Sequence, residues 1–205
     1  MNTEIDKSDI TAVVLAGGMG RRMGGQDKGL TPLAGRPLIT WVLERLQPQI
    51  GQVLINANRN SDTYSKLGYP VITDTISGYA GPLAGMLSAM KVCQTPYLLS
   101  VPCDSPFIPK TLVSRLAHTL ATRQAGISVA HDGRRLQPVF ALMQTALRDS
   151  LQVFLDQGGR KIDAWYAEQH MAPADFSDLP DTFINLNTPE DLLRASVRIE
   201  KIANG

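Results

Sequence analysis

The feature that most limits how this chain can fold is a regular alternation of short apolar runs with stretches of helical spacing. The apolar runs are rich in β-branched residues and have polar or turn residues on both sides, as buried strands do. They cover residues 10–15, 53–55, 71–73 and 97–101. Between them, apolar residues recur at helical spacing over 38–46 and over 83–90. Strands that alternate with helices favour a mostly parallel sheet covered on both faces.

The second half of the chain departs from this rhythm. Residues 127–143 hold two apolar runs separated by Asp132-Gly133, a strong signal for a two-residue hairpin turn, so we expect an antiparallel excursion there. Helical patterns follow at 145–155 and at 189–202, the second opened by a cap residue, Thr188, and by Pro189. The predicted fold class is therefore α/β, a three-layer, Rossmann-like α/β/α arrangement. With no repeat or linker, residues 1–205 are expected to form a single domain.

Composition excludes several classes of function. The 205 residues carry a net charge of only +1, so a general nucleic-acid or membrane surface is not indicated, and any functional positive charge must be local. The sequence has no stretch of about 18 consecutive apolar residues that would indicate a membrane span. Cys93 and Cys103 lack the spacing of a zinc motif or a disulfide framework. We expect a cytoplasmic protein with reduced thiols.

A glycine-rich, basic segment, LAGGMGRRMGGQDKG, follows the first predicted strand, from Leu15 to Gly29. Neither the dinucleotide fingerprint nor the P-loop fits it, because Met23 stands where a third glycine is needed and no Gly-Lys-Ser/Thr is present. A glycine-rich turn after a strand can bring backbone N–H groups to phosphate oxygens, which Arg22 and Lys28 would neutralise. The alternative is a flexible surface turn with solvated charges.

Three polar residues follow other predicted strands and so lie on the ligand side of such a sheet. Asp104 comes after the strand 97–101, where a carboxylate suits Mg²⁺ together with phosphate oxygens, although an aspartate in a turn often serves only the turn itself. Asn56 and Asp74 end the strands before it. A carboxylate can accept both N1–H and N2–H₂ of guanine, an edge that cytosine and adenine do not offer, so this pair is a candidate for the base site. Contacts with the ribose or the phosphates stay open as alternatives.

These residues carry a family resemblance. Leu15-Ala16-Gly17-Gly18, Gly20, Arg22-Met23-Gly24 and Lys28 resemble the signature of sugar-phosphate and cofactor nucleotidyltransferases. Within that superfamily the chain is similar to the molybdenum cofactor guanylyltransferases, which join GMP from GTP to molybdopterin. The supporting segments run in order through nearly the whole chain: NANRN at 56–60, DTISGYAGPLAGM from Asp74, VPCDSPFIP from Val101, HDGRRLQPVFAL and NLNTPEDL.

The resemblance implies roles for individual residues. It implies that Arg22, Lys28 and Asp104 are the catalytic residues and that Asp104 binds Mg²⁺. GTP contacts fall on the N-terminal half of the chain, at Leu15, Ala16, Gly17, Gly18, Lys28, Asn56, Asp74 and Asp104. Molybdopterin is expected on the C-terminal half, where basic and polar residues lie near the hairpin, near the Gly158-Gly159 turn and before the last helix, at Arg134, Gln137, Arg160, Lys161, Asn185 and Asn187. Charges on a hairpin can also be merely solvated.

Rival hypotheses remain open at this point. The chain could be a cytidylyltransferase acting on the same cofactor, a sugar-1-phosphate nucleotidyltransferase, or a carrier or sensor that binds GTP without turnover. Cofactor-biosynthesis proteins and apo-molybdoenzymes or their chaperones are the expected partners, since the product must reach the enzymes that use it. The three histidines show no metal-ligand spacing, and Cys103 is interpreted as an inert thiol.

Overall fold

The computed structural model describes residues 5–16, 27–76 and 81–203. Gly17, Gly18 and Arg22, all predicted at the phosphate site, lie outside the described residues. In chain order the strands and α-helices are β1 (Ile10–Leu15), β2 (Pro32–Leu33), β3 (Arg36–Pro37), α1 (Leu38–Leu46), β4 (Gln52–Asn56), α2 (Ser61–Ser65), β5 (Val71–Ile72), α3 (Pro82–Val92), β6 (Tyr97–Pro102), α4 (Leu112–Thr122), β7 (Ile127–His131), β8 (Leu136–Gln144), α5 (Arg148–Asp156), α6 (Ile162–Ala167), β9 (Met171–Asp175) and α7 (Pro189–Ala203).

Within the described residues, seven strands form one sheet in the order β5-β4-β1-β6-β8-β7-β9. The neighbours β5, β4, β1 and β6 are parallel, whereas β8 runs antiparallel to both β6 and β7. The predicted fold class is therefore confirmed, including the antiparallel excursion in the second half.

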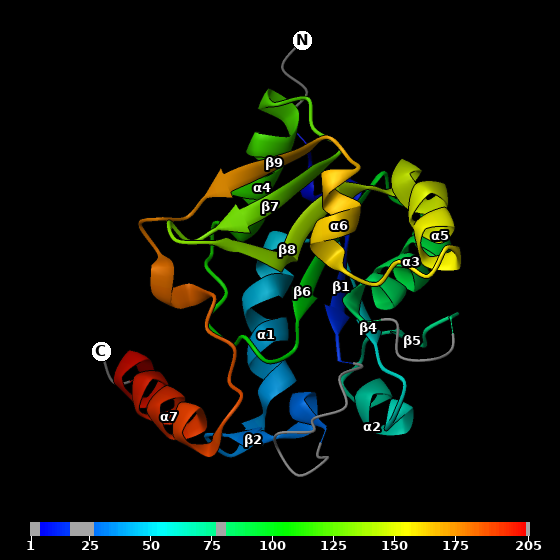
Figure 1. Ribbon diagram of the computed structural model, residues 1–205. Coiled ribbons are helices and arrows are strands. Elements are labelled where there is room, and N and C mark those ends of the chain that lie inside the picture. Colours follow the sequence, from blue (N-terminus) through cyan, green and yellow to red (C-terminus); the bar gives the residue numbers. More distant parts are fainter. Residues whose placement is uncertain (1–4, 17–26, 77–80, 204–205) are drawn as a thin grey trace.

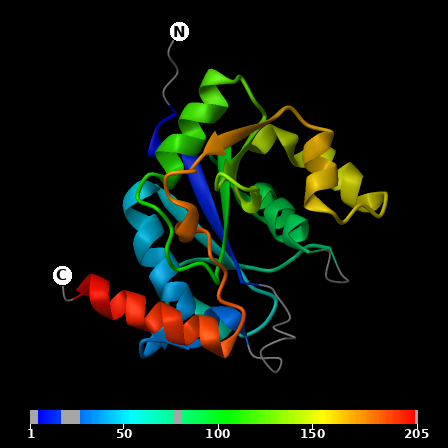
Figure 2. The same cartoon turned by 60° about the vertical axis from the view of Figure 1, so that its left-hand side comes forward.

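Helices cover both faces of this sheet, as Figures 1 and 2 show. One hydrophobic cluster joins the sheet to α1 and α4, and a second joins it to α3, α5 and α6. Because both faces are buried, the central strand β1 is apolar along almost its whole length and loses the alternation of a half-exposed strand. A third, smaller cluster packs α7 against Leu33, Leu38 and Phe107 at the end of the sheet where β1 stops.

The hairpin turn differs from the sequence prediction. His131 pairs with Leu136, so the turn has four residues, Asp132 to Arg135, and is not the two-residue turn that Asp132-Gly133 indicated. The Asp132 carboxylate accepts hydrogen bonds from the backbone N–H groups of Arg134 and Arg135, both at 2.8 Å, and these bonds close the longer turn. Gly133 has a φ of 90°, which a glycine adopts at low cost.

Candidate active site

The carboxyl ends of three neighbouring parallel strands meet at one point. Leu15, the last residue of β1, is in register with Asn56 of β4 on one side and with Pro102 of β6 on the other. The Ala16 N–H donates to the Asn56 carbonyl at 2.8 Å, and the Cys103 N–H donates to the Leu15 carbonyl at 3.2 Å. The predicted positions Leu15, Ala16 and Asn56 therefore lie side by side with the turn that holds Asp104.

Asp104 follows β6 and is nearly buried, with a side chain that is 10% exposed. Its Oδ2 accepts a hydrogen bond from the Lys28 ammonium at 3.1 Å. Its Oδ1 is buried and has no hydrogen-bond partner among the described residues. A buried carboxylate oxygen without a partner is costly unless a ligand or an ion satisfies it. Asp104 therefore has the free, directed oxygen that a bound cation would need.

A single carboxylate is compatible with magnesium. No group of three or more His, Cys, Asp or Glu side chains that could hold a metal occurs among residues 5–16, 27–76 and 81–203. Mg²⁺ characteristically takes one or two protein carboxylates and completes its shell with water and phosphate oxygens. The donor set at Asp104 fits that pattern and does not fit an all-protein metal cage.

The segment before α7 reaches the same place. The Lys28 ammonium also donates to the Asn187 side-chain oxygen, and the Ser105 hydroxyl donates to Asn185 Oδ1 at 3.0 Å. The Leu186 N–H donates to the Asp104 carbonyl at 2.9 Å. Asn185 and Asn187, predicted on the molybdopterin side, are thus adjacent to the predicted catalytic pair Lys28 and Asp104.

The predicted base-binding pair is joined by a hydrogen bond. Asn56 Nδ2 donates to Asp74 Oδ1 at 2.9 Å, and Asn58, which sequence analysis did not single out, donates from Nδ2 to Asp74 Oδ2 at 2.7 Å. The Asp74 N–H donates in return to Asn58 Oδ1 at 2.8 Å. Each carboxylate oxygen therefore has one donor already and keeps a lone pair for a further one.

Helix α3 approaches this pair closely. A Cβ placed on Gly85 would lie 2.7 Å from Leu15 Cδ2, closer than real Cβ atoms come, and 3.0 Å from Asn56 Cγ, which is a tight contact. Glycine at this position allows the helix backbone to pack directly on the strand ends. Pro82 occupies the first turn of α3, where it needs no N–H partner.

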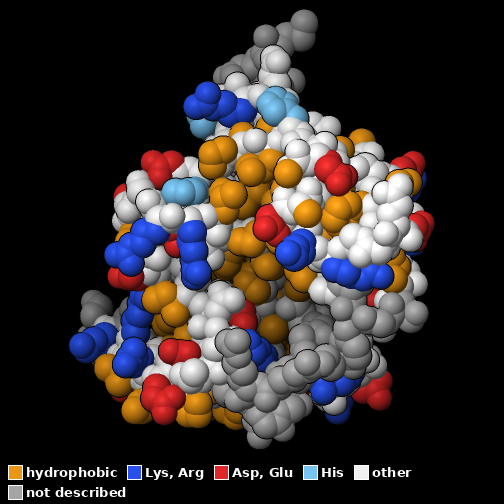
Figure 3. All heavy atoms as spheres, in the orientation of Figure 1, with side chains coloured by type: hydrophobic (Ala, Val, Ile, Leu, Met, Phe, Trp, Pro, Cys, Tyr) orange, Lys and Arg blue, Asp and Glu red, His pale blue; other side chains and the backbone are white. Residues whose placement is uncertain are grey.

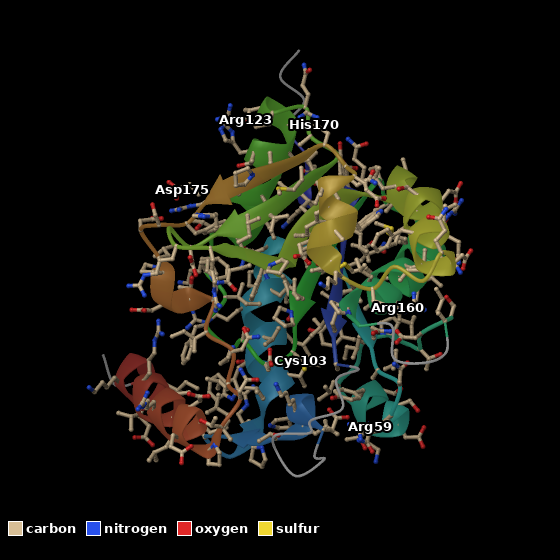
Figure 4. All side chains as sticks on the ribbon, in the orientation of Figure 1. Arg59, Cys103, Arg123, Arg160, His170 and Asp175 are labelled. Atoms are coloured by element: carbon tan, nitrogen blue, oxygen red, sulfur yellow. The ribbon has the colours of Figure 1, made fainter. Side chains whose placement is uncertain are left out.

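The remaining residues of the predicted molybdopterin set divide into two groups. Gln137 is buried and donates to Asp132 Oδ2 at 2.7 Å, so it supports the turn that carries Arg134. Arg160 donates to the Leu155 and Gly159 carbonyls, at 2.8 and 2.6 Å, after α5. Figure 4 shows Arg160 beside α3, with Cys103 at the carboxyl end of β6. Lys161 follows Arg160 and is the N-cap residue of α6.

Figure 3 shows a hollow on one face of the molecule. Figure 3 shows hydrophobic side chains on its floor, where Figure 1 has β8 and β6, and charged side chains around its rim. Because β8 is antiparallel to β6, its first residues lie at the edge where β6 ends. Gln137, near the start of β8, is therefore at the same end of the sheet as Asp104, and the Arg160 carbonyl oxygen lies 3.9 Å from where a Cβ on Gly81, the residue before α3, would be.

Cys103 does not have the properties of a nucleophile. It is buried in the cluster beneath α1 and α4, and this burial raises the pKa of its thiol well above the ordinary value of 9.0, with the charge of Asp104 adding to the effect. A thiol with a raised pKa is protonated at neutral pH and unreactive. This supports its interpretation as an inert thiol.

Sequence analysis also missed Asp27, which directly precedes Lys28, and the two residues that contact its carboxylate. The Tyr64 hydroxyl and Asn60 Nδ2 each donate to one oxygen of the Asp27 carboxylate. The sequence does hold a signal for Asp27, because it directly precedes Lys28, and for Asn60, because it lies in the segment NANRN. For Tyr64 the sequence holds no signal, since its contact with Asp27 spans 37 positions.

The sequence matches a known family model and is similar to named relatives. Residues 12–171 match the family model described as the MobA-like NTP transferase domain. A protein of Shewanella loihica named molybdenum cofactor guanylyltransferase is 53% identical over 190 residues, covering 93% of this chain and 97% of the relative. A protein of the same name from Shewanella sediminis is 53% identical over 192 residues, or 94% and 98% of the two chains.

Two solved structures are similar to this chain over nearly its whole length. Molybdopterin-guanine dinucleotide biosynthesis protein A from Archaeoglobus fulgidus superposes with a TM-score of 0.77 at 26% identity, covering 93% of this chain and 99% of that one. The 2-C-methyl-D-erythritol 4-phosphate cytidylyltransferase of Thermus thermophilus has a TM-score of 0.67 at 18% identity, covering 92% and 98%, and is similar in fold. Among the described helices, none is long and apolar enough to cross a membrane.

Proposed function

This chain belongs to the MobA-like NTP transferase family and, within it, to the molybdenum cofactor guanylyltransferases, which are nucleotidyltransferases; from this premise we propose that it transfers GMP from GTP to the terminal phosphate of molybdopterin. The products would be molybdopterin guanine dinucleotide and pyrophosphate. The observation that carries the proposal is the state of Asp104, which has one oxygen on the Lys28 ammonium and the other buried without a partner among the described residues.

In the proposed reaction an oxygen of the molybdopterin phosphate attacks the α-phosphorus of GTP in line. The bond from the α-phosphorus to the bridging oxygen of the β-phosphate breaks, and pyrophosphate leaves with that electron pair. The nucleophile is already an anion, so no general base is required. The main barrier is repulsion between anions, which this site would lower by positioning the reactants and by neutralising charge.

We assign the charge neutralisation to Lys28 and Arg22 and the metal to Asp104. A Mg²⁺ ion held by Asp104 would supply positive charge to the phosphate oxygens. Lys28 donates to both Asp104 and Asn187, and its side chain is 23% exposed, so it is not sealed from solvent. Backbone N–H groups of Gly17 and Gly18 would contribute further donors to the triphosphate.

We propose that the Asn56–Asp74 pair recognises the guanine base. Two donors on adjacent positions of the guanine edge would meet the free lone pairs of the Asp74 carboxylate. Leu15 and Ala16 would border the nucleotide beside them. A wrong base would leave polar groups of the site without partners, which is how such a site discriminates strongly.

We place molybdopterin on the C-terminal half, against Arg134, Gln137, Arg160, Lys161, Asn185 and Asn187. Support comes from the position of Asn187 beside Lys28 and of Gln137 at the edge where β6 ends. The acceptor phosphate would then approach the α-phosphate from this half while GTP occupies the other. Cofactor-biosynthesis proteins and apo-molybdoenzymes or their chaperones are the proposed partners, and the cytoplasm is the proposed location.

The test is pyrophosphate release by the purified protein with Mg²⁺ and molybdopterin, with GTP, CTP or ATP in parallel and with the acceptor omitted as a control. The proposal predicts acceptor-dependent release with GTP alone. Release with CTP in place of GTP would show a cytidylyltransferase, and GTP binding without release would show a carrier or sensor. In a further arm with a sugar 1-phosphate in place of molybdopterin, release only with that acceptor would show another transferase.

A further inference from the structure

Asp27, the residue directly before Lys28, is held by two side chains of the α2 segment, the N-cap residue Asn60 and Tyr64 within the helix. The buried hydroxyl of Tyr64 donates to Asp27 Oδ1, and Asn60 Nδ2 donates to Asp27 Oδ2 at 3.0 Å. Both oxygens of this carboxylate are therefore engaged by one short stretch of chain, whose position Arg59 marks in Figure 4. None of these three residues has a role in the function proposed above.

Tyr64 contacts the residue on the other side of Lys28 as well. A Cβ on Gly29 would lie 3.3 Å from Tyr64 Cε1 and Cζ and still closer to the hydroxyl oxygen, so the phenol packs directly on the Gly29 backbone. The Tyr64 side chain is fully buried in the cluster beneath α1 and α4. One rigid, buried ring thus contacts the residues before and after Lys28.

The chain around Lys28 is a short 3-10 turn, Lys28–Leu30, and its own hydrogen bonds are local. The Leu30 N–H donates to the Asp27 carbonyl and the Thr31 N–H to the Lys28 carbonyl, both at 3.1 Å. Such a turn by itself leaves the position of the lysine Cα relative to the sheet undetermined. Leu30 packs against the core cluster, and the contacts with Tyr64 and Asn60 add a tertiary restraint on the Asp27 side of the turn, because α2 is packed on the core through Tyr64.

We propose that Tyr64, assisted by Asn60, is a positioning residue that sets where the Lys28 ammonium meets the triphosphate. The inference rests on the proposed function, in which Lys28 neutralises phosphate charge. A lysine side chain is long and flexible, so the placement of its backbone decides which oxygens it reaches. Small displacements of a group that stabilises charge cost a large share of its effect.

The carboxylate of Asp27 is well suited to this purpose. Burial raises the pKa of the Tyr64 phenol above its ordinary value, so the hydroxyl is a donor across the working pH range and Asp27 is the acceptor. Two donors in different directions fix both the position and the plane of a carboxylate, which a single hydrogen bond does not.

The experiment is a double-mutant cycle on GTP affinity, measured by calorimetry with Mg²⁺ in the full-length protein. Tyr64→Phe keeps the ring and removes only the hydroxyl. We expect it to weaken GTP binding about tenfold, and by less than about twofold in the Lys28→Met background. A change of about tenfold lies within the range of coupling energies measured for residues of one hydrogen-bond network. Loss of the effect in that background is the sign that Tyr64 acts through Lys28.

Tyr166→Phe is the matched control. Tyr166 is also buried, and its hydroxyl donates to the Pro138 carbonyl at 2.8 Å, but it lies in the cluster on the opposite face of the sheet. It loses the same kind of bond, so a comparable loss of stability is expected without a change in GTP affinity. Asn60→Ala, at an exposed residue, is the second variant should Tyr64→Phe not fold.

The outcomes separate the inference from the function on which it rests. Equal weakening by Tyr64→Phe with and without Lys28 would overturn the inference, because the hydroxyl would then act through general stability. Unchanged GTP affinity in Tyr64→Phe, with weakened affinity in Lys28→Met, would overturn the inference and leave the proposed function intact. Unchanged affinity in Lys28→Met would refute the assigned role of Lys28 and the inference together.

Discussion

Gly85→Ala tests the close packing between α3 and the proposed base-binding pair. The added Cβ would lie 2.7 Å from Leu15 Cδ2 and 3.0 Å from Asn56 Cγ, with Asn56 Oδ1 closer still. Asn56 is only 3% exposed and donates to Asp74 at 2.9 Å, so a shift of its side chain would disturb this hydrogen bond. Either the helix moves outward or the Asn56–Asp74 hydrogen bond is distorted.

Two opposing terms set the expected change in stability. Overpacking of a buried site costs about 1–3 kcal/mol. Replacing glycine by alanine inside a helix returns about 1 kcal/mol. The free energy of unfolding should therefore fall by about 0–2 kcal/mol, which corresponds to a Tm lower by up to about 8 °C in a chain of this size.

The effect on GTP should be larger than the effect on stability. A hydrogen bond to a charged group contributes about 1.5–3 kcal/mol, so misplacing Asn56 against Asp74 should weaken GTP binding about ten- to hundredfold. Calorimetric titration with GTP and thermal unfolding of the same samples measure both quantities. The transfer rate at saturating GTP should change less, because the phosphate contacts remain.

Gly126→Ala is the matched control. It adds the same methyl group near the amino end of β7, where the nearest atom is the flexible end of Leu147 at 3.3 Å. It should leave GTP affinity unchanged. A folded Gly85→Ala variant with the affinity of the unmodified protein would refute the reasoning, since the added methyl group would then not disturb the Asn56–Asp74 pair in a way that GTP binding detects.

Two further predictions follow from individual carboxylates. Asp74→Asn should weaken GTP binding and favour xanthosine triphosphate, whose carbonyl at C2 can accept from an amide; competition binding with the two nucleotides measures the ratio, and an unchanged ratio would remove Asp74 from the base site. Burial raises the pKa of Asp132, but the N–H groups of Arg135 and Arg134 and the amide of Gln137 outweigh it and hold that pKa below 3.8. The stability that the ionised Asp132 carboxylate adds to the folded protein should be fully present above its ordinary pKa of 3.8. It should be lost as the pH falls through the lowered pKa that Asp132 has in the folded state. Urea unfolding of Asp132→Asn beside the unmodified protein should therefore show a stability difference that vanishes in acid, whereas a difference independent of pH would contradict this account.

The sequence was sufficient where a pattern is local. Strands β4 and β6 are apolar runs followed by polar residues, and they flank β1 in parallel, so Asn56 and Asp104 could be predicted at the same edge of the sheet. The cap of α7 could also be predicted. Thr188 Oγ1 accepts from the Asp191 N–H at 3.1 Å, and Asp191 Oδ2 accepts from the Thr188 N–H at 3.0 Å, so both bonds lie within three residues.

Features that depend on long-range contacts could not be predicted. Strand β9 contains Pro173, which demotes a strand pattern, yet it lies at the sheet edge, where a proline is tolerated. Asn187 contacts Lys28 across 159 positions, so a residue assigned to one substrate proves to be adjacent to the residue assigned to the other. Only the assembled sheet brings such pairs together, since neither residue has a local pattern that names its partner.

The central claim is GMP transfer at a site built around Asp104, and its most direct measurement follows the label of [α-³²P]GTP into molybdopterin with Mg²⁺ present. The unmodified protein should form labelled molybdopterin guanine dinucleotide in step with pyrophosphate. Asp104→Ala should fold and form none. Asp149→Ala, a change at a carboxylate that is 84% exposed on α5, should match the unmodified protein. Labelled product formed by Asp104→Ala at the normal rate would contradict the account.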